Sequence, residues 1–546
     1  MRMRQLSPAI LNPSEHGEEP LILERLMAML SRRTLVQGAA ALSLTTSPLL
    51  ASRLLAAADR PALPIPPEIR ADANGVIALT ARRGQMNFVP GLTTPTYGIN
   101  GDYLGPTVRA RRGDKLAMRV NNRLDQDITM HWHGAIVAGE ADGGPHSAIK
   151  PAATWTAAFT VAQPAATLWY HPHIYPATAE LVVRGLAGLF IIDDEDSDAL
   201  GLPSRYGVDD IPLVLQDRRF TPDGQIFHRM NLPAVTVGYV GDVMLVNGAP
   251  SPVAKTARGW LRFRVLNGSN ARNYRFAVSD DRAFYMIATD GGLLEAPVEI
   301  KTIDIHPGER FEILIDARDG KPFDLVTHPV EAPIMRLPPF DGALPMVSIV
   351  PDGVDGAGRL PDALVRLPAL PNELPPLSRT IETTMNLDAQ GMGELKRAGI
   401  MKIGLHQPAD PALVRQLTQR LVDDPALSES EQLAANGING VPFALQMERM
   451  EVLRGRPLRW LISEGTDQML HPIHIHGCQF RILSFGKGPV PPRLTGWKDT
   501  VPIEAGGSAE ILVTFPLGAS EAFPYMVHCH ILEHEDSGMM AQFTVA

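Results

Sequence analysis

The histidines of this chain constrain its structure most strongly. Ten of the 16 fall in four short segments, and each segment contains two histidines separated by one residue. These segments are HWHG (His131, His133), WYHPHI (His171, His173), HPIHIHG (His471, His474, His476) and HCHILEH (His528, His530, His534). In a strand, residues i and i+2 point to the same face, so each pair can present two imidazoles toward one site. Four pairs supply eight imidazoles, which exceeds a tetrahedral zinc site and favours a cluster of several metal ions. A single His-x-His pair is usually structural, and zinc is the alternative metal for the whole set.

Cys529 lies between His528 and His530, so in a strand it points to the opposite face and belongs to a second site. This second site can take three further residues, which are His471, His534 and Met539. Two imidazoles, a thiolate and a weak axial thioether are the ligands of a blue-copper electron-transfer centre. The HCH peptide would connect that centre to the cluster through its backbone.

A repeated unit indicates the fold. RRGDKLAMRVNN (111–122), ARGWLRFRVLNG (257–268) and LRGRPLRWLISE (453–464) each have an Arg-Gly turn followed by alternating apolar and polar residues. This alternation is typical of half-buried strands. At roughly 150 residues per domain, 546 residues allow about three domains, and 47 Gly and 48 Pro favour turns and short strands. The sequence therefore predicts an all-β protein of three related β-sandwich domains.

The predicted boundaries follow from these units. They are an extension with a signal peptide (1–58), domain 1 (59–197), domain 2 (198–352), a Pro-rich linker (353–377) and domain 3 (378–546). Domain 3 contains a predicted helical insert at about 378–440. Within it, ADPALVRQLTQRLVDD has Asp410 as N-cap and Leu413, Leu417 and Leu421 on one face of a short amphipathic helix.

The N-terminal region resembles a twin-arginine export signal. Arg32 and Arg33 precede a modestly apolar stretch that ends near Ala56 and Ala58. A membrane anchor is the competing interpretation, which Pro48 and an internal arginine disfavour. The signal predicts a periplasmic protein exported by the twin-arginine machinery without a membrane anchor. The net charge of −10 and the absence of a basic run exclude a nucleic-acid partner.

The sequence resembles the multicopper oxidases over almost the whole chain after the signal, because HWHG, HPH, HPIHIHG and HCHILEHEDSGMM stand in the family's order. The resemblance implies three cupredoxin-like Greek-key domains and four copper ions, one type 1, one type 2 and two type 3. The implied type 1 ligands are His471, Cys529, His534 and Met539. The implied type 2 ligands are His131 and His474, and the implied type 3 ligands are His133, His171, His173, His476, His528 and His530. Asp142 and Glu535 resemble the carboxylates that supply and relay protons in related enzymes.

The resemblance is closest to periplasmic copper-efflux oxidases and bacterial laccases. Asp467 and Met469 match positions that bind substrate Cu(I), and Asp388 with Met385 could complete that site. The insert holds few methionines, unlike the Met-rich insert of the efflux oxidases. The leading hypothesis is thus a monomeric enzyme that couples four one-electron oxidations, of Cu(I) or of a small phenolic or aromatic donor, to the reduction of O2 to water.

Three alternatives stay open. The first is a laccase or bilirubin-oxidase-like enzyme that acts on phenols or aromatic amines. The second is a non-catalytic periplasmic copper-binding protein, and the third is a structural protein of the cell envelope. Relatives that have lost their coppers and serve in division are expected to lack some ligands, and this chain has them all. Cys478 is either a small buried hydrophobe or a reactive thiol, and no disulfide with Cys529 is expected.

Overall fold

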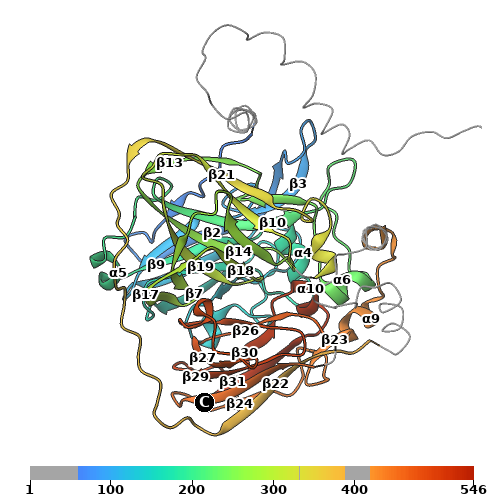
Figure 1. The fold of residues 1–546 in the computed structure, drawn as a ribbon. Helices are drawn as coiled ribbons and strands as arrows, with labels where there is room; N and C mark the ends of the chain where they lie inside the picture. Colours follow the sequence, from blue (N-terminus) through green and yellow to red (C-terminus); the bar gives the residue numbers. More distant parts are fainter. Residues whose placement is uncertain (1–59, 331, 388–418, 466) are drawn as a thin grey trace, which may run out of the picture. The chain divides into compact units, whose positions relative to one another are not determined.

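The computed structural model describes residues 60–330, 332–387, 419–465 and 467–546. The predicted signal peptide, Asp388 and most of the predicted helix, including Asp410, Leu413 and Leu417, lie outside these residues. Among the described residues, no helix is both long and apolar enough to cross a membrane. Their strands form six sheets that pair into three β-sandwiches, which confirms the predicted all-β fold (Figure 1).

The first sandwich carries two of the histidine pairs. One sheet has the strand order β1 (Glu68–Ile69), β4 (Thr107–Arg111), β9 (Gly188–Asp193), β8 (Ala166–His171) and β6 (His131–His133). The facing sheet has the order β3 (Thr94–Ile99), β2 (Val76–Met86), β5 (Lys115–Asn122) and β7 (Thr154–Thr160). Its short helices are α3 (Gly139–Asp142), α4 (Thr178–Val183) and α5 (Glu195–Ala199). Leu79, Met118 and Leu168 belong to the core shared by both sheets.

The second sandwich contains no His-x-His pair. Its larger sheet has the order β12 (Ala249–Pro250), β11 (Val243–Val246), β10 (Asp210–Arg218), β14 (Trp260–Asn267), β19 (Arg310–Asp316), β16 (Phe284–Thr289) and β17 (Gly292–Ile300). The other sheet has the order β13 (Val253–Arg258), β21 (Leu344–Asp355), β20 (Phe323–His328), β15 (Tyr274–Val278) and β18 (Thr302–Ile305). Helix α6 (Leu232–Val237) and the 3-10 turn η1 (Pro333–Arg336) lie in its loops.

The third sandwich, in orange and red in Figure 1, carries the other two histidine pairs. One sheet has the order β23 (Asn436–Ile438), β22 (Leu377–Met385), β25 (Leu458–Glu464), β29 (Ser508–Val513) and β27 (Phe480–Phe485). The other has the order β24 (Met450–Val452), β31 (Met540–Val545), β30 (Tyr525–Cys529), β26 (His471–Ile475) and β28 (Thr500–Ile503). Its helical segments are α9 (Glu429–Ala434), η2 (Pro492–Leu494) and α10 (Leu532–Glu535).

The strand after each Arg-Gly turn occupies the same place in its sandwich. Strand β5 pairs parallel with β2 and antiparallel with β7. Strand β14 pairs in the same way with β10 and β19, and β25 with β22 and β29. In β5 and β25 alternate residues are buried, as the period of two predicts. Strand β14 is buried on both faces. On one face Arg262 forms an ion pair with Glu312, and Arg264 donates a hydrogen bond to Thr167 of the first sandwich, which covers this face.

This arrangement corrects the predicted insert at 378–440. Its first residues form β22, which is the counterpart of β2 and β10, and residues 436–438 form β23 of the same sheet. Ile381, Thr383 and Met385 are buried on one face of β22, which is the period-two pattern of a strand and not the pattern of a helix. Leu421 lies in a helical segment at 419–423 and packs beside Met385. Residues 356–376 form no helix or strand.

Candidate metal centre

Two pairs of strands bring the histidines together. In the first sandwich β6 pairs with β8, which places His131 opposite His171. In the third sandwich β26 pairs with β30, which places His474 opposite His528. His133 lies in β6 itself, and the other three histidines, His173, His476 and His530, follow within two residues of β8, β26 and β30. All eight are buried, so the four segments meet in the interior, between the first and third sandwiches.

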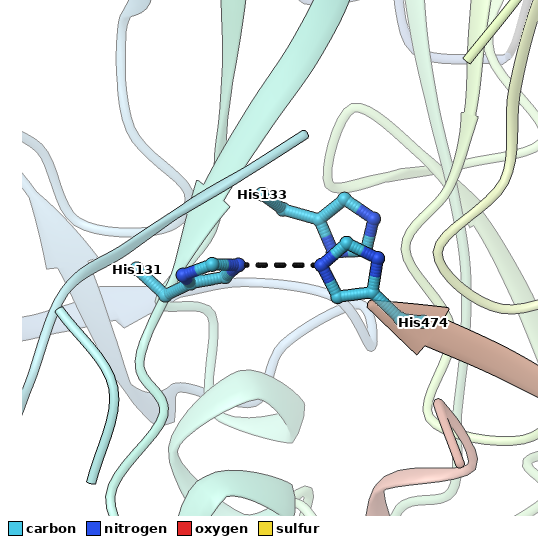
Figure 2. Close-up of side chains that lie close together, drawn as sticks. All are labelled: His131, His133 and His474. Atoms are coloured by element: carbon cyan, nitrogen blue, oxygen red, sulfur yellow. Dashed lines mark hydrogen bonds between the residues drawn. The ribbon is translucent and has the colours of Figure 1, made fainter. Parts of the chain in front are cut away.

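The eight histidines form three groups, and within each group the ligand atoms lie within 4.8 Å of one another. These groups are His131, His133 and His474; His133, His171 and His530; and His173, His476 and His528. Every group draws residues from both sandwiches. Figure 2 shows the first group, in which the rings of His133 and His474 stack with centroids 3.6 Å apart.

In the first group two ring nitrogens face each other, and neither of them carries a proton. His131 Nδ1 donates to the Asp142 carbonyl at 2.9 Å, and His474 Nδ1 donates to the Asp499 carbonyl at 2.8 Å. These bonds place the lone pair of each neutral ring on Nε2. The two Nε2 atoms lie 3.4 Å apart (Figure 2), an arrangement that a cation between them would stabilise.

The third group has the same design. His476 Nδ1 contacts Asp142 Oδ2 at 2.7 Å, and His528 Nδ1 contacts the Cys529 carbonyl at 3.0 Å. The Nε2 of His528 then lies 3.2 Å from the Nε2 of His173 and 3.3 Å from that of His476. In the second group, the Nε2 of His171 and both nitrogens of His530 are buried without a hydrogen-bond partner among the described residues. Convergent or unpartnered buried imidazole nitrogens fit metal ions well.

The protonation of the cluster favours metal binding too. Burial, followed by the repulsion between neighbouring imidazoles, holds the pKa of His131, His171, His173 and His530 well below the usual value. These rings are therefore neutral near pH 7. A neutral imidazole has the lone pair that a metal ion requires, so no proton has to be displaced.

The two acids predicted as proton donors lie against these histidines. Asp142 is buried, which raises its carboxyl pKa well above the usual value, and it contacts His131 and His476. The carboxylate oxygens of Glu535 lie 3.2 Å from His173 Nδ1 and 3.1 Å from His528 Nδ1. Carboxylates in such positions fix the orientation of ligand rings.

Sequence reasoning missed one carboxylate and its partner. Asp499 Oδ1 lies 3.0 Å from His133 Nε2, and both oxygens of Asp499 accept from Arg310 of the second sandwich, at 2.8 and 2.6 Å. Neither residue stands in a histidine motif, so no sequence signal could have identified them. The second sandwich therefore supports the cluster although it carries none of its histidines.

The second site lies within the third sandwich. Cys529 Sγ is 3.5 Å from His471 Nδ1 and 3.7 Å from His534 Nδ1, and all three residues are buried. Met539 is fully buried in the same core. His528 and His530 belong to the other cluster, so Cys529 faces the opposite way, as the strand alternation predicts.

A carboxylate also orients this second site. Asp467 accepts from His471 Nε2 at 2.9 Å, which leaves His471 Nδ1 beside the thiol. Burial alone would lower the pKa of His471, but the Asp467 carboxylate raises it well above its usual value. Burial lowers the pKa of His534 to about 3. Burial also raises the pKa of the Cys529 thiol, so a metal would have to displace its proton.

The predicted substrate-copper site is not assembled as expected. Asp467 is fully buried, and its carboxylate is occupied by His471 and by the backbone N–H of Met469. It therefore supports a buried imidazole rather than an incoming ion. Met385 and Met469 do meet, in an apolar cluster that also contains Met335, a residue that sequence reasoning missed.

Comparison with known proteins identifies the family. The sequence pattern described as multicopper oxidase matches residues 80–197, 230–333 and 410–546. The chain belongs to the multicopper oxidase family. The predicted resemblance is confirmed, and the family together with the histidine groups indicates copper binding.

Among solved structures of this family, the laccase-like multicopper oxidase CueO from Ochrobactrum sp. is 35% identical. The match has a TM-score of 0.75 and covers 89% of this chain and 100% of that one. That protein is described as having oxidase activity toward lignin model compounds and lignosulfonate. McoA from Aquifex aeolicus is 29% identical, with a TM-score of 0.72 and coverage of 89% and 99%.

Curated relatives in the multicopper oxidase family carry a different name. The cell division protein FtsP of Xenorhabdus nematophila is 34% identical over 493 residues, which cover 88% of this chain and 92% of that protein. FtsP of Escherichia coli K12 is 33% identical over 520 residues, with coverage of 94% and 99%. Each match spans more than nine-tenths of the relative.

These relatives contradict the predicted oxidase activity, because they are named for cell division and not for oxidation. The prediction of an enzyme that reduces O2 with electrons from Cu(I) or a phenol is wrong. The expectation that a full ligand set argues against a division-associated protein is wrong for the same reason. Ligand residues determine which ion a fold can bind, and the same fold supports different functions.

Proposed function

We propose that this protein is a non-catalytic, copper-holding component of the cell envelope that acts in cell division. The observation that carries the proposal is the match, at 33–34% identity and over nearly the full length, to proteins named for cell division. The structure of the metal centre supports a role for copper in holding the protein together.

The location of the histidine groups favours a structural role. Each group combines imidazoles from the first and third sandwiches, so each bound ion would be shared between two domains. An ion that binds the folded arrangement and not the unfolded chain stabilises that arrangement, by about 4.1 kcal/mol when its concentration is a thousandfold above Kd. Copper would thus hold the first and third sandwiches in one arrangement.

Four ions fit the ligand set. His131 and His474 would share one ion, and the other six histidines of the cluster would hold two. His471, Cys529 and His534, with Met539 as a weak fourth ligand, would hold the last. Imidazole and thiolate ligands suit copper, and Asp142, Glu535, Asp499 and Asp467 keep the rings in place.

The cell envelope is the proposed location. The segment with Arg32 and Arg33 resembles a signal for the twin-arginine route. Export in the folded state would let the buried centre form before the protein leaves the cytoplasm. Division also takes place at the envelope, so location and role agree.

A complementation experiment in the host bacterium tests the proposal. The gene is deleted, and cell length is measured under envelope stress with wild-type protein, His474→Gln or His328→Gln supplied. His474 lies in the cluster, whereas His328 lies outside it at the end of β20. We expect the deletion strain to form elongated cells, and we expect wild type and His328→Gln to restore division better than His474→Gln.

The purified proteins complete the test. Copper should raise the unfolding temperature of wild type and His328→Gln more than that of His474→Gln. Normal division of the deletion strain, together with sustained oxygen uptake by the copper-loaded protein in the presence of a reductant, would overturn the proposal.

A further inference from the structure

A cavity of about 570 Å³ lies away from the copper ligands, where residues 365–370 of the interdomain linker pass all three sandwiches. Figure 1 shows this linker as the gold trace that runs from β21 past β17 to β22. The walls include Gln163 of the first sandwich, Leu293 of the second, and Arg481 and Trp497 of the third. Cavities of about 300–1,000 Å³ are typical of sites for small organic ligands.

Hydrogen bonds hold the linker in place as a wall of this cavity. Val365 N–H donates to the carbonyl of Leu294 at 3.2 Å, and Leu367 N–H donates to the carboxylate of Glu295 at 3.3 Å. Leu370 is 42% exposed, although it is a large apolar residue. An apolar ligand in the cavity would cover it.

One polar atom in the wall has no partner. Gln479 is 8% exposed and lines the cavity, and its Nε2 makes no hydrogen bond among the described residues. A buried amide N–H group without an acceptor is costly. The Nε2 atom is itself shielded from solvent, so an acceptor in the cavity meets it when the Gln479 side chain turns toward the cavity.

The charged groups at the cavity favour an anion. Arg112, Arg366 and Arg481 line it, and Arg481 Nη1 donates to the carbonyl of Pro368 in the linker at 3.5 Å. The Arg481 guanidinium lies 5.7 Å from the centre of the Trp497 ring, and burial lowers its pKa. Two acids line the cavity: Asp194 accepts from the backbone N–H groups of Ala165 and Ser197, and Asp196 is exposed. Glu295, which accepts from Leu367 N–H, is the acid whose charge raises the pKa of Arg481 against the effect of burial.

We propose that this cavity binds an amphiphilic organic anion, with its apolar chain against Leu293, Trp497 and Leu370. The carboxylate or sulfonate head would accept a hydrogen bond from Gln479 Nε2 and pair with Arg481. The ligand would touch the linker and the second and third sandwiches, so binding would stiffen the junction between them. This inference goes beyond the proposed role in division and does not depend on it.

Calorimetric titration of the full-length, copper-loaded protein tests the inference with decanoate as the probe. We expect decanoate to bind, and decyltrimethylammonium and butyrate to bind at least tenfold more weakly. Arg481→Gln and Gln479→Leu should each weaken decanoate binding by about tenfold, which corresponds to about 1.4 kcal/mol. Ala369→Trp, in the exposed linker wall, should block binding by filling the cavity.

The control is Arg454→Gln, which removes an exposed arginine of the third sandwich that does not line the cavity. It should leave decanoate binding unchanged. The unfolding temperature of each variant shows that the protein is folded. Equal binding of the cationic and anionic probes, loss of affinity in Arg454→Gln equal to that in Arg481→Gln, or no decanoate binding to wild type would each overturn the inference.

Discussion

Replacing Arg310 by Met tests whether the second sandwich supports the histidine cluster. The Arg310 and Asp499 side chains are fully buried and joined by two short hydrogen bonds, and Asp499 also contacts His133. Arg310→Met leaves the carboxylate in the interior without its cation. Breaking a buried pair from one side costs about 3–5 kcal/mol, against a typical total stability of about 5–15 kcal/mol.

The assay is the denaturant midpoint of the copper-free protein, followed by copper titration. The matched control is Arg318→Met, because Arg318 pairs with Asp316 at the surface, where the two side chains are 65% and 39% exposed. Surface pairs contribute about 0–1 kcal/mol, so this variant should unfold close to wild type. Adding Asp499→Asn to Arg310→Met should recover part of the loss, since it removes the unpaired charge. Equal midpoints for Arg310→Met and Arg318→Met would refute the reasoning.

Three further predictions concern the third sandwich. Cys529→Ser should lose about one of the bound copper ions. Cys478→Ser should lose none, because Cys478 is a buried thiol outside the ligand groups. Equal copper content in the two variants, measured by atomic absorption, would contradict this prediction. Asp467→Asn removes the carboxylate that orients His471. It should lower the affinity of this site for its copper ion by about 10–100-fold, measured by competition with a chelator. A variant with the affinity of wild type would exclude an orienting role for Asp467. The pKa of His534 is about 3 in the folded protein and about 6.5 in the unfolded chain, so the unfolded chain binds more protons between these values. The copper-free protein should therefore lose stability as the pH falls below about 6.5. The loss due to this residue is up to about 1.4 kcal/mol per pH unit. His534→Gln should flatten that dependence in denaturant midpoints measured across this range, and an unchanged slope would count against it.

The names of the relatives separate the part of the function that the sequence predicted correctly from the part that it did not. The ligand residues predicted a copper-binding chain, and the family and the histidine groups agree. Activity depends on whether electron donors and oxygen reach bound copper, and residue identity does not express this. The inference from a full ligand set to an oxidase was therefore the step that failed.

The sequence by itself determined the local geometry. A strand has a period of two, so His528 and His530 had to point away from Cys529, and the strands after the first and third Arg-Gly turns bury alternate residues. The same rule, applied to Leu377–Met385, predicts a strand at the start of the segment that we expected to be a helical insert. These features depend only on neighbours along the chain, which is why a single sequence contains them.

Only the tertiary structure decided which distant groups meet. It places Asp499 between Arg310 and His133, one residue from each sandwich, and it buries Asp467 against His471. It also closes the cavity under the linker, whose walls come from all three sandwiches. Such contacts are set by how whole sheets pack, and packing depends on the shapes and charges of many residues together. A short sequence motif therefore cannot predict them.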